Sequence, residues 1–297
     1  MANSKRPFAR LLRVSTTRID GGNLFGSMPK EKWEKFISPD RQNRVAIGNY
    51  SMLLDHSDGW ILVNVGPGDK APSNLNIAPM RSRSSLLREL RELGLAPKDI
   101  STIVLTHLCE EYAGGGTHMT SSGRVLPTFP NARYVVQKTA LQDAMGPNER
   151  NTRYYRTDDF EPLVESEQIE IVSGSTEIAD GVWVEPASGP TAGHQIVIAE
   201  GPMATYAFLG TLIPTSMHLC PQVTMASDWN PEATVRAKAE VKRHAIREAW
   251  QVAPVGRDDW VCAEDLESIA AFSTGVLEAM PATPVKMRIR ERARAVA

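Results

Sequence analysis

The stretch TIVLTHLCEEYAGG, from Thr102 to Gly115, brings several reactive side-chain types close together. His107, Cys109, Glu111 and Tyr112 supply an imidazole, a thiol, a carboxylate and a phenol. Because imidazole, thiolate and carboxylate all bind Zn²⁺, the first three are candidate ligands for a single ion. An imidazole also favours the reactive thiolate form of a nearby cysteine, so a second interpretation has Cys109 as nucleophile and His107 as its base.

A structural interpretation of the same residues stands beside these two. In it, His107 is a hydrogen-bonded residue at the end of a strand, Cys109 fills space as a small buried side chain, and Glu111 is a loop carboxylate. The chemistry of these residue types therefore leaves binding, catalysis and packing open.

The elements that must position this stretch follow from hydrophobic pattern and turn residues. TIVLTH itself predicts a short buried strand. Before it, residues 46–68 form two apolar runs broken at Asp58-Gly59, which predicts a hairpin. Leucines at positions 86, 87, 90 and 93 predict an amphipathic helix that Gly94 ends. Further strands are predicted at ARYVVQ, EIVSG, GVWVEPA, HQIVIAE and MATYAFLG.

Two later segments complete the organisation. Residues 230–250 predict a charged amphipathic helix with Asn230 as cap and Pro231 at its first position. Residues 146–161 lack clear periodicity and predict a loop or short-helix excursion of the kind that covers a site. Strand clusters separated by helices favour an α/β fold with helices flanking mixed sheets in one domain, residues 1–297.

Composition gives no support for several classes of partner. Lys and Arg total 33 against 35 Asp and Glu, and a net charge of -2 gives no general reason to bind nucleic acid or an anionic membrane. Three scattered cysteines suit a reducing compartment better than a disulfide framework. With neither a signal-peptide core nor a run long enough to span a membrane, we expect a cytoplasmic protein.

Several stretches occur in a characteristic order: IDGGNLFGSMPKEKWEK, NVGPGDK, TIVLTH before a Gly-rich turn, PTFPNARYVVQ, GPTAGHQ and YAFLGTLIPTSMHL. Together they resemble the metallo-β-lactamase fold superfamily, and most of all its lactonase-like branch of soluble hydrolases. The resemblance covers nearly the whole chain. It implies a metallo-β-lactamase-like αββα sandwich, in which two mixed β-sheets are flanked by helices.

The same resemblance identifies the positions that hold two Zn²⁺ ions in the family. There, His and Asp side chains bind both ions, and a bound water gives hydroxide near neutral pH. Of these positions, His107 alone is unchanged; the others hold Cys109, Glu111, Tyr112, Pro190, Thr211 and, after the late helix, Gly256. His194 matches a family histidine that is not a ligand, and Asn64 replaces the Asp of an early V-D-T-G turn.

We therefore expect no two-zinc centre and no cofactor in this chain, with His107, Cys109 and Glu111 as residual candidates for one ion. A partner chain is the expected carrier of zinc or another divalent metal. The catalytic candidates are His107, Glu111 and Tyr112. The resemblance and the excursion segment add candidates for the substrate pocket: Asn64, Thr211, His218 and Tyr154.

Two hypotheses about function follow. In the first, the chain is a structural or gating subunit of a heteromeric hydrolase, paired with a metal-binding paralogue and acting on a small-molecule ester, lactone or activated aryl ether. In the second, the remodelled pocket serves a metal-independent hydrolase, in which His107 and Glu111 supply acid–base chemistry and Tyr112 and Thr211 bind an oxyanion. A third possibility is a pseudoenzyme, which keeps the pocket and binds a ligand without turnover.

Overall fold

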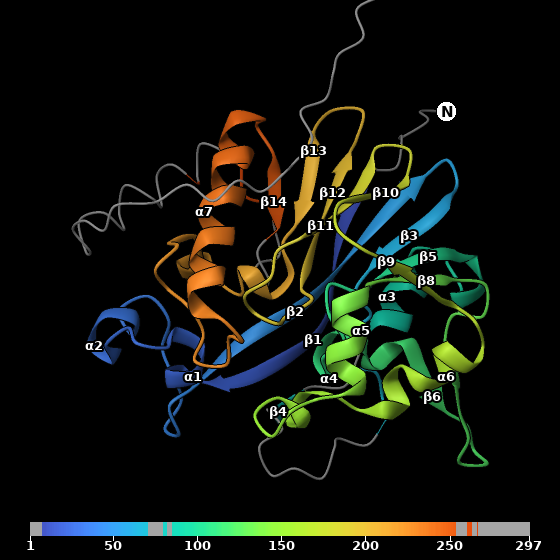
Figure 1. The fold of residues 1–297 in the computed structure, drawn as a ribbon, viewed down its shortest axis with the longest axis horizontal. Helices are drawn as coiled ribbons and strands as arrows, with labels where there is room; N and C mark the ends of the chain where they lie inside the picture. Colours follow the sequence, from blue (N-terminus) through green and yellow to red (C-terminus); the bar gives the residue numbers. More distant parts are fainter. Residues whose placement is uncertain (1–7, 71–79, 82–84, 254–259, 263–265, 267–297) are drawn as a thin grey trace, which may run out of the picture.

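Two β-sheets lie face to face in the computed structural model, which describes residues 8–70, 80–81, 85–253, 260–262 and 266 (Figure 1). The seven-stranded sheet has the order β4-β1-β2-β3-β5-β8-β9. Its strands are β1 (Ala9–Asp20), β2 (Arg44–His56), β3 (Gly59–Val63), β4 (Met80–Arg81), β5 (Ile100–Val104), β8 (Arg133–Gln137) and β9 (Ile169–Val172). The predicted hairpin is confirmed as β2 and β3, which pair up to His56 opposite Gly59.

The second sheet has five strands in the order β10-β11-β12-β13-β14. They are β10 (Thr176–Ala179), β11 (Val182–Pro186), β12 (Gln195–Glu200), β13 (Thr205–Phe208) and β14 (Gln251–Ala253). A separate ribbon joins β6 (Thr117–Met119) to β7 (Val125–Pro127). Both main sheets are mixed, because β3, β5, β8 and β9 pair in parallel in the first and β13 pairs with β14 in parallel in the second.

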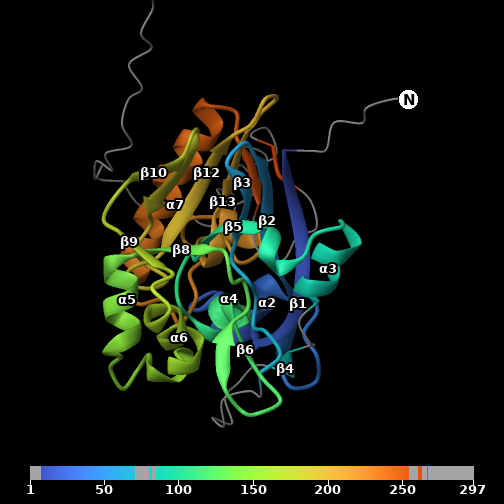
Figure 2. The same cartoon turned by 90° about the vertical axis from the view of Figure 1, so that its right-hand side faces the viewer.

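Helices cover both outer faces of the two sheets (Figure 2). They are α1 (Gly21–Phe25), α2 (Lys30–Trp33), α3 (Leu86–Glu92), α4 (Glu110–Ala113), α5 (Lys138–Met145), α6 (Glu161–Glu165) and α7 (Pro231–Arg247). Apolar residues of β2, β3, β11 and β12 fill the space between the sheets, while α3 and α5 pack on the first sheet and α7 on the second. This is the predicted αββα sandwich. No helix in the described ranges is long and apolar enough to cross a membrane.

Two of the predicted helices form as the sequence indicates. The Asn230 side chain accepts a hydrogen bond from the Ala233 amide and caps α7, whose first residue is Pro231. The helix α3 is followed by Gly94, whose φ of 78° lies in the left-handed region that glycine tolerates.

The loops that follow parallel strands β3, β5 and β8 meet at one edge of the sandwich, since parallel strands end on the same side. The turn after β3 lies directly against the loop after β5. A Cβ atom on Gly115 would collide with the Val65 carbonyl oxygen, and one on Gly114 with that of Pro67. The glycines after β5 therefore permit the close backbone approach that positions His107.

A buried lysine connects three of these loops. The Lys70 ammonium donates to the carbonyl oxygens of Gly114 and Thr117 at 2.6 and 2.9 Å, and its Nζ lies 3.0 Å from Asp159 Oδ1. The Lys70 and Asp159 side chains are 2% and 0% exposed, so water screens neither charge. Burial lowers the pKa of Lys70 and raises the pKa of Asp159, while their mutual attraction opposes both shifts.

We expect Lys70→Met to lower the free energy of unfolding by about 3 to 5 kcal/mol, because it leaves the Asp159 carboxylate buried without its cation. Urea unfolding followed by tryptophan fluorescence measures the change. Arg88→Met is the matched control, since Arg88 pairs with Glu89 on an exposed surface where the effect is expected to be small. Equal stability of the two variants would contradict the role given to Lys70.

Candidate functional site

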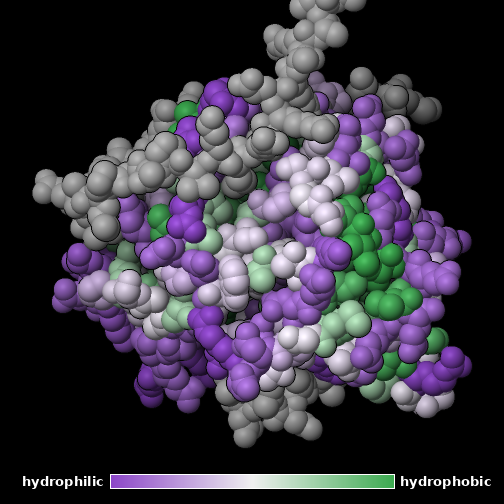
Figure 3. Space-filling model, viewed as in Figure 1, coloured by the Kyte–Doolittle hydropathy of each residue, from purple (hydrophilic) through white to green (hydrophobic). Residues whose placement is uncertain are grey.

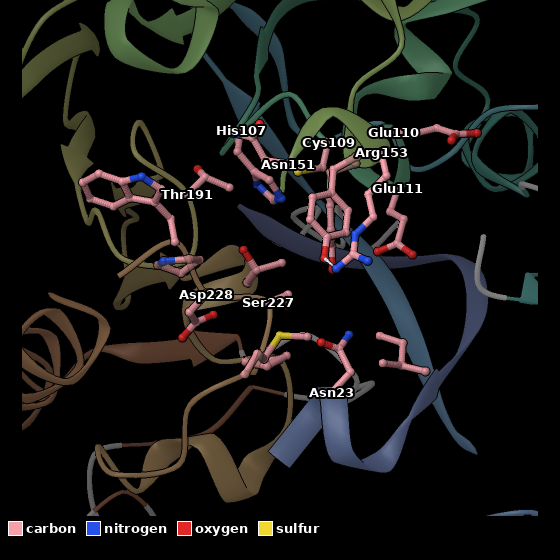
Figure 4. A pocket seen from close by; sticks show the side chains of 18 of the residues that line it. Asn23, His107, Cys109, Glu110, Glu111, Asn151, Arg153, Thr191, Ser227 and Asp228 are labelled. Carbon is pink, nitrogen blue, oxygen red and sulfur yellow. Dashed lines mark hydrogen bonds between the residues drawn. The ribbon is translucent and has the colours of Figure 1, made fainter. Parts of the chain in front are cut away.

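A cavity of about 620 Å³ lies at this edge of the sandwich (Figure 4). The loop after β5 contributes its floor, and the segment 143–155 forms one wall. Residues 190–191, 211–214 and 225–229 contribute the facing wall, and residues 18–23 of β1 and α1 complete the lining. The predicted excursion over residues 146–161 forms short turns at Thr152–Tyr154 and Thr157–Asp159, and the first of these borders the cavity.

His107 projects from the end of β5 into this cavity (Figure 4). Its Nδ1 lies 2.9 Å from Thr106 Oγ1, and its ring centroid lies 4.6 Å from that of Tyr112. His194 is buried behind it, with ring centroids 5.4 Å apart, and does not line the cavity. Burial, and then the neighbouring His194, lowers the pKa of His107 well below its ordinary value, so the imidazole is neutral at physiological pH.

The hydrogen bonds around Asn64 determine which His107 nitrogen carries the proton. The Thr106 amide donates to Asn64 Oδ1 at 2.9 Å, which fixes the orientation of the amide side chain. Thr106 Oγ1 lies 3.1 Å from the same oxygen and donates its single proton there, because two acceptors would otherwise face each other. Thr106 Oγ1 must then accept from His107 Nδ1–H. The Nε2 lone pair of His107 is left to face the cavity.

The Cys109 thiol is engaged on the other side of the floor. Tyr155 donates its phenolic proton to Asp143 at 2.6 Å, and the Cys109 thiol hydrogen-bonds the same phenol. Asn151 donates to the other Asp143 oxygen at 2.9 Å. Burial, together with the carboxylates of Glu111 and Asp143, raises the pKa of the Cys109 thiol far above its ordinary value. A thiol held in this form is a poor nucleophile, which disfavours the Cys109–His107 interpretation.

The floor also carries the carboxylates of Glu110 and Glu111, and its other groups are uncharged. Burial raises the pKa of Tyr112 well above its ordinary value, so the phenol is protonated. Thr191 and Thr211 also line the cavity, and their hydroxyl oxygens are buried without a hydrogen-bond partner among the described residues. Pro190 lies beside them on the wall.

Two residues expected in the pocket lie elsewhere. Asn64 is fully buried beneath His107, where it accepts from Thr106, and it does not reach the cavity. His218 is also fully buried, with Nδ1 2.8 Å from Thr215 Oγ1 and Nε2 2.8 Å from the Leu24 carbonyl, and its ring stacks on Phe25. Asn64 is thus a positioning residue, and His218 belongs to the core.

The other expected site residues, His107, Cys109, Glu111, Tyr112, Tyr154 and Thr211, all line the cavity. Gly256, which the resemblance places at the last ligand position, lies outside the described residues. Asp143, Thr191, Arg153 and Trp229 also line the cavity but were not predicted as site residues. Arg153 lies in the predicted excursion, next to Tyr154, and Thr191 lies in the GPTAGHQ stretch, whereas Asp143 on α5 and Trp229 before α7 carried no signal.

The sequence profile of the metallo-beta-lactamase superfamily matches residues 45–242, which run from β2 into α7 and include the whole cavity lining except residues 18–23. The chain belongs to the metallo-β-lactamase superfamily. The match confirms the family inferred from the order of motifs, and with it the fold.

Curated relatives place the chain near lactonases of this superfamily. It is 24% identical over 159 residues to an N-acyl homoserine lactonase from Bacillus sp, which is 50% of this chain and 56% of the relative. An N-acyl homoserine lactonase from Bacillus cereus is 24% identical over 160 residues, with the same coverage. The chain therefore spans about half the length of the curated relatives it matches.

Solved structures share the fold over most of the chain. A probable metal-dependent hydrolase from Staphylococcus aureus has a TM-score of 0.79 at 23% identity, covering 86% of this chain and 92% of that one. A quorum-quenching N-acyl homoserine lactone lactonase has a TM-score of 0.65 at 20% identity, covering 83% and 90%. At these identities the likeness concerns the fold alone.

The metallo-β-lactamase family implies a zinc centre, and the donors at this cavity do not fit one. A thiol must lose its proton to bind zinc, but burial keeps Cys109 protonated and its hydrogen bond runs to Tyr155. Tyr112 and Thr211 offer neutral oxygens, and Pro190 offers no side-chain donor. Within the described ranges, no three His, Cys, Asp or Glu side chains are placed to hold a metal ion. His107, Cys109 and Glu111, the residual candidates for one ion, are therefore not arranged as a metal-binding group among the described residues.

We expect ¹⁵N NMR spectra to show His107 with a proton on Nδ1, a bare Nε2, and no titration between pH 8 and 6.5, because its pKa lies well below 6.5. Asn64→Leu removes the acceptor of the Thr106 hydroxyl, which then donates to Nδ1 and moves the ring proton to Nε2. Asn131→Leu, at an exposed amide, is the control and leaves the spectrum of His107 unchanged. A proton on Nε2 in the unaltered protein would refute the network.

Proposed function

We propose that this chain is a subunit of a heteromeric metallo-β-lactamase-fold hydrolase, in which a paralogous subunit carries the metal and this chain supplies structure or gates the reaction. The observation that carries the proposal is the contrast within one edge of the sandwich. The loops are tightly packed around a cavity of about 620 Å³, a size usual for small-molecule sites, while the donors at the ligand positions, apart from the Glu111 carboxylate, are neutral. This contrast supports a chain that keeps the scaffold of the family and leaves the metal to a partner.

The proposed substrate is a small-molecule ester, lactone or activated aryl ether. The curated relatives are named as lactonases, which supports the lactone among these classes. Attack by a metal-bound hydroxide on any of the three requires a centre with strong anionic donors. In the proposed assembly that centre belongs to the partner, and this chain binds, orients or encloses the substrate.

The surface supports a partner chain. Hydrophobic residues gather on the side of the molecule that carries β8, β9 and α6 (Figure 3). Ile171, on edge strand β9, is 54% exposed, and Val164 on α6 is 42% exposed. An edge strand with exposed apolar side chains is a liability in a protein that works alone, and it suits a surface that another chain covers.

We expect native mass spectrometry of the protein isolated from its own source to show a complex of two different chains, with the metal mass retained by the other chain after the complex is dissociated. Ile171→Arg should weaken the complex by placing a charge in the interface. Leu87→Arg, at an exposed leucine of α3, is the matched control and should leave it intact. A homomer with stoichiometric zinc and its own turnover would refute the proposal.

A second candidate function, a metal-independent hydrolase, is favoured by the orientation of His107. Its bare Nε2 faces the cavity that Thr191 and Thr211 also line. In such an enzyme the imidazole takes a proton from water as the water attacks a carbonyl carbon, and later returns it to the leaving oxygen. The threonine hydroxyls, or the Tyr112 phenol, would donate to the oxyanion that forms.

Under this second candidate, the purified chain hydrolyses p-nitrophenyl acetate or a γ-lactone in the presence of a chelator, and His107→Gln lowers the rate by about a hundredfold or more without unfolding the protein. His118→Gln, at an exposed histidine of β6, is the control for loss of an imidazole. An unchanged rate in His107→Gln, or no hydrolysis by the unaltered chain, would exclude this function.

A further inference from the structure

Three arginines lie on or directly after the wall segment 143–155, and two of them have structural roles. Arg150 donates to the carbonyl oxygens of Ala226 and Asp228 at 3.0 and 2.9 Å, which fastens the wall to the facing loop. Arg156 pairs with Glu110 at 3.5 Å and with Asp158 at 3.2 Å. Both guanidinium groups are therefore occupied within the fold.

The third, Arg153, is held toward the cavity without a counter-ion. Its guanidinium donates to the Tyr154 hydroxyl at 2.7 Å and lies over the Tyr154 ring, 4.8 Å from the centroid. Figure 4 shows it turned into the cavity. It makes no ion pair with any acidic side chain in the described part of the chain. Stacking on a phenol ring fixes the plane of the guanidinium and leaves its other donors open.

Most carboxylates of the lining are already engaged. Asp143 accepts from Tyr155 and Asn151, and Glu110 pairs with Arg156. Asp20 caps α1 and accepts from Asn43. Glu111 remains close to the floor, where its charge raises the pKa values of Cys109 and Tyr112.

The two ends of the cavity thus differ in character. The floor presents the His107 imidazole, and Thr191 and Thr211 line the facing wall. The wall presents the Arg153 cation, and the half-exposed indole of Trp229 lies in the facing lining. An indole and a phenol offer flat apolar surfaces, and a planar guanidinium matches a carboxylate in a bidentate pair.

We propose that the cavity binds a flat aromatic molecule with an anionic, carboxylate-like group, whose charge pairs with Arg153 and whose uncharged part faces the His107 floor. The inference rests on the proposed function in one respect, because it names the class of small molecule that the cavity takes. Arg153 is its specificity-determining residue, and the Tyr154 ring is the support that orients it.

The test compares 2-naphthoate with 2-naphthamide, two probes of one shape that differ in charge, by isothermal titration of the protein with whatever partner it carries. We expect the anion to bind about tenfold more tightly, as a charge-assisted pair implies. Arg153→Gln should remove this preference by weakening naphthoate while leaving naphthamide. Glu111→Gln should tighten naphthoate alone, because it removes a negative charge from the cavity.

Arg91→Gln, at an exposed arginine of α3 outside the cavity, is the control for net charge and should preserve the preference. Equal binding of the two probes, binding of neither, or a preference that survives Arg153→Gln would overturn the proposal. The heteromer is detected by mass without either probe. Loss of the preference in an intact heteromer would therefore remove the ligand class and leave the subunit role standing.

Discussion

The edge of the sandwich that carries the cavity depends on the contacts of the buried Lys70 ammonium. The Lys70 side chain joins the turn after β3 to the carbonyl groups of Gly114 and Thr117 and to Asp159, which follows the wall segment. The hydroxyl of Thr117 in turn donates to the Asp158 carbonyl at 2.7 Å. Because a buried cation must keep its partners close, these contacts hold the loops around the site in one arrangement.

That arrangement leaves a site in which the imidazole, phenol and thiol of the floor are ordered but neutral, beside the Glu111 carboxylate. The Asn64 amide orients Thr106, and Thr106 orients His107, so the imidazole presents a lone pair where the family presents a zinc ligand. Tyr112 and Cys109 keep their protons because burial opposes a charge on each side chain. His107, Tyr112 and Cys109 therefore line the cavity as neutral hydrogen-bonding groups.

The sequence predicted the parts of the fold that local pattern determines. The hairpin of β2 and β3, the strands β5, β8, β9, β11, β12 and β13, and the capped helix α7 are confirmed because apolar runs and turn residues specify them, whereas β6, β7, β10 and β14 were not predicted. The long strand β1 was missed. Its three arginines interrupt the apolar alternation, and its stability comes from pairing with β2 over most of its length. Such pairing is not visible in a local window of sequence.

The site shows the same division between what is local and what is not. His107, Glu111 and Tyr112 follow one strand, so their presence in the cavity follows from one motif. His218 matched a family position as well, but the approach of Leu24 gives its Nε2 a buried partner and removes it from the cavity. Arg153, which was not predicted, lies at the cavity, while its neighbours Arg150 and Arg156 make the structural contacts. A residue's role here depends on which neighbours are already satisfied, and only the folded chain determines that.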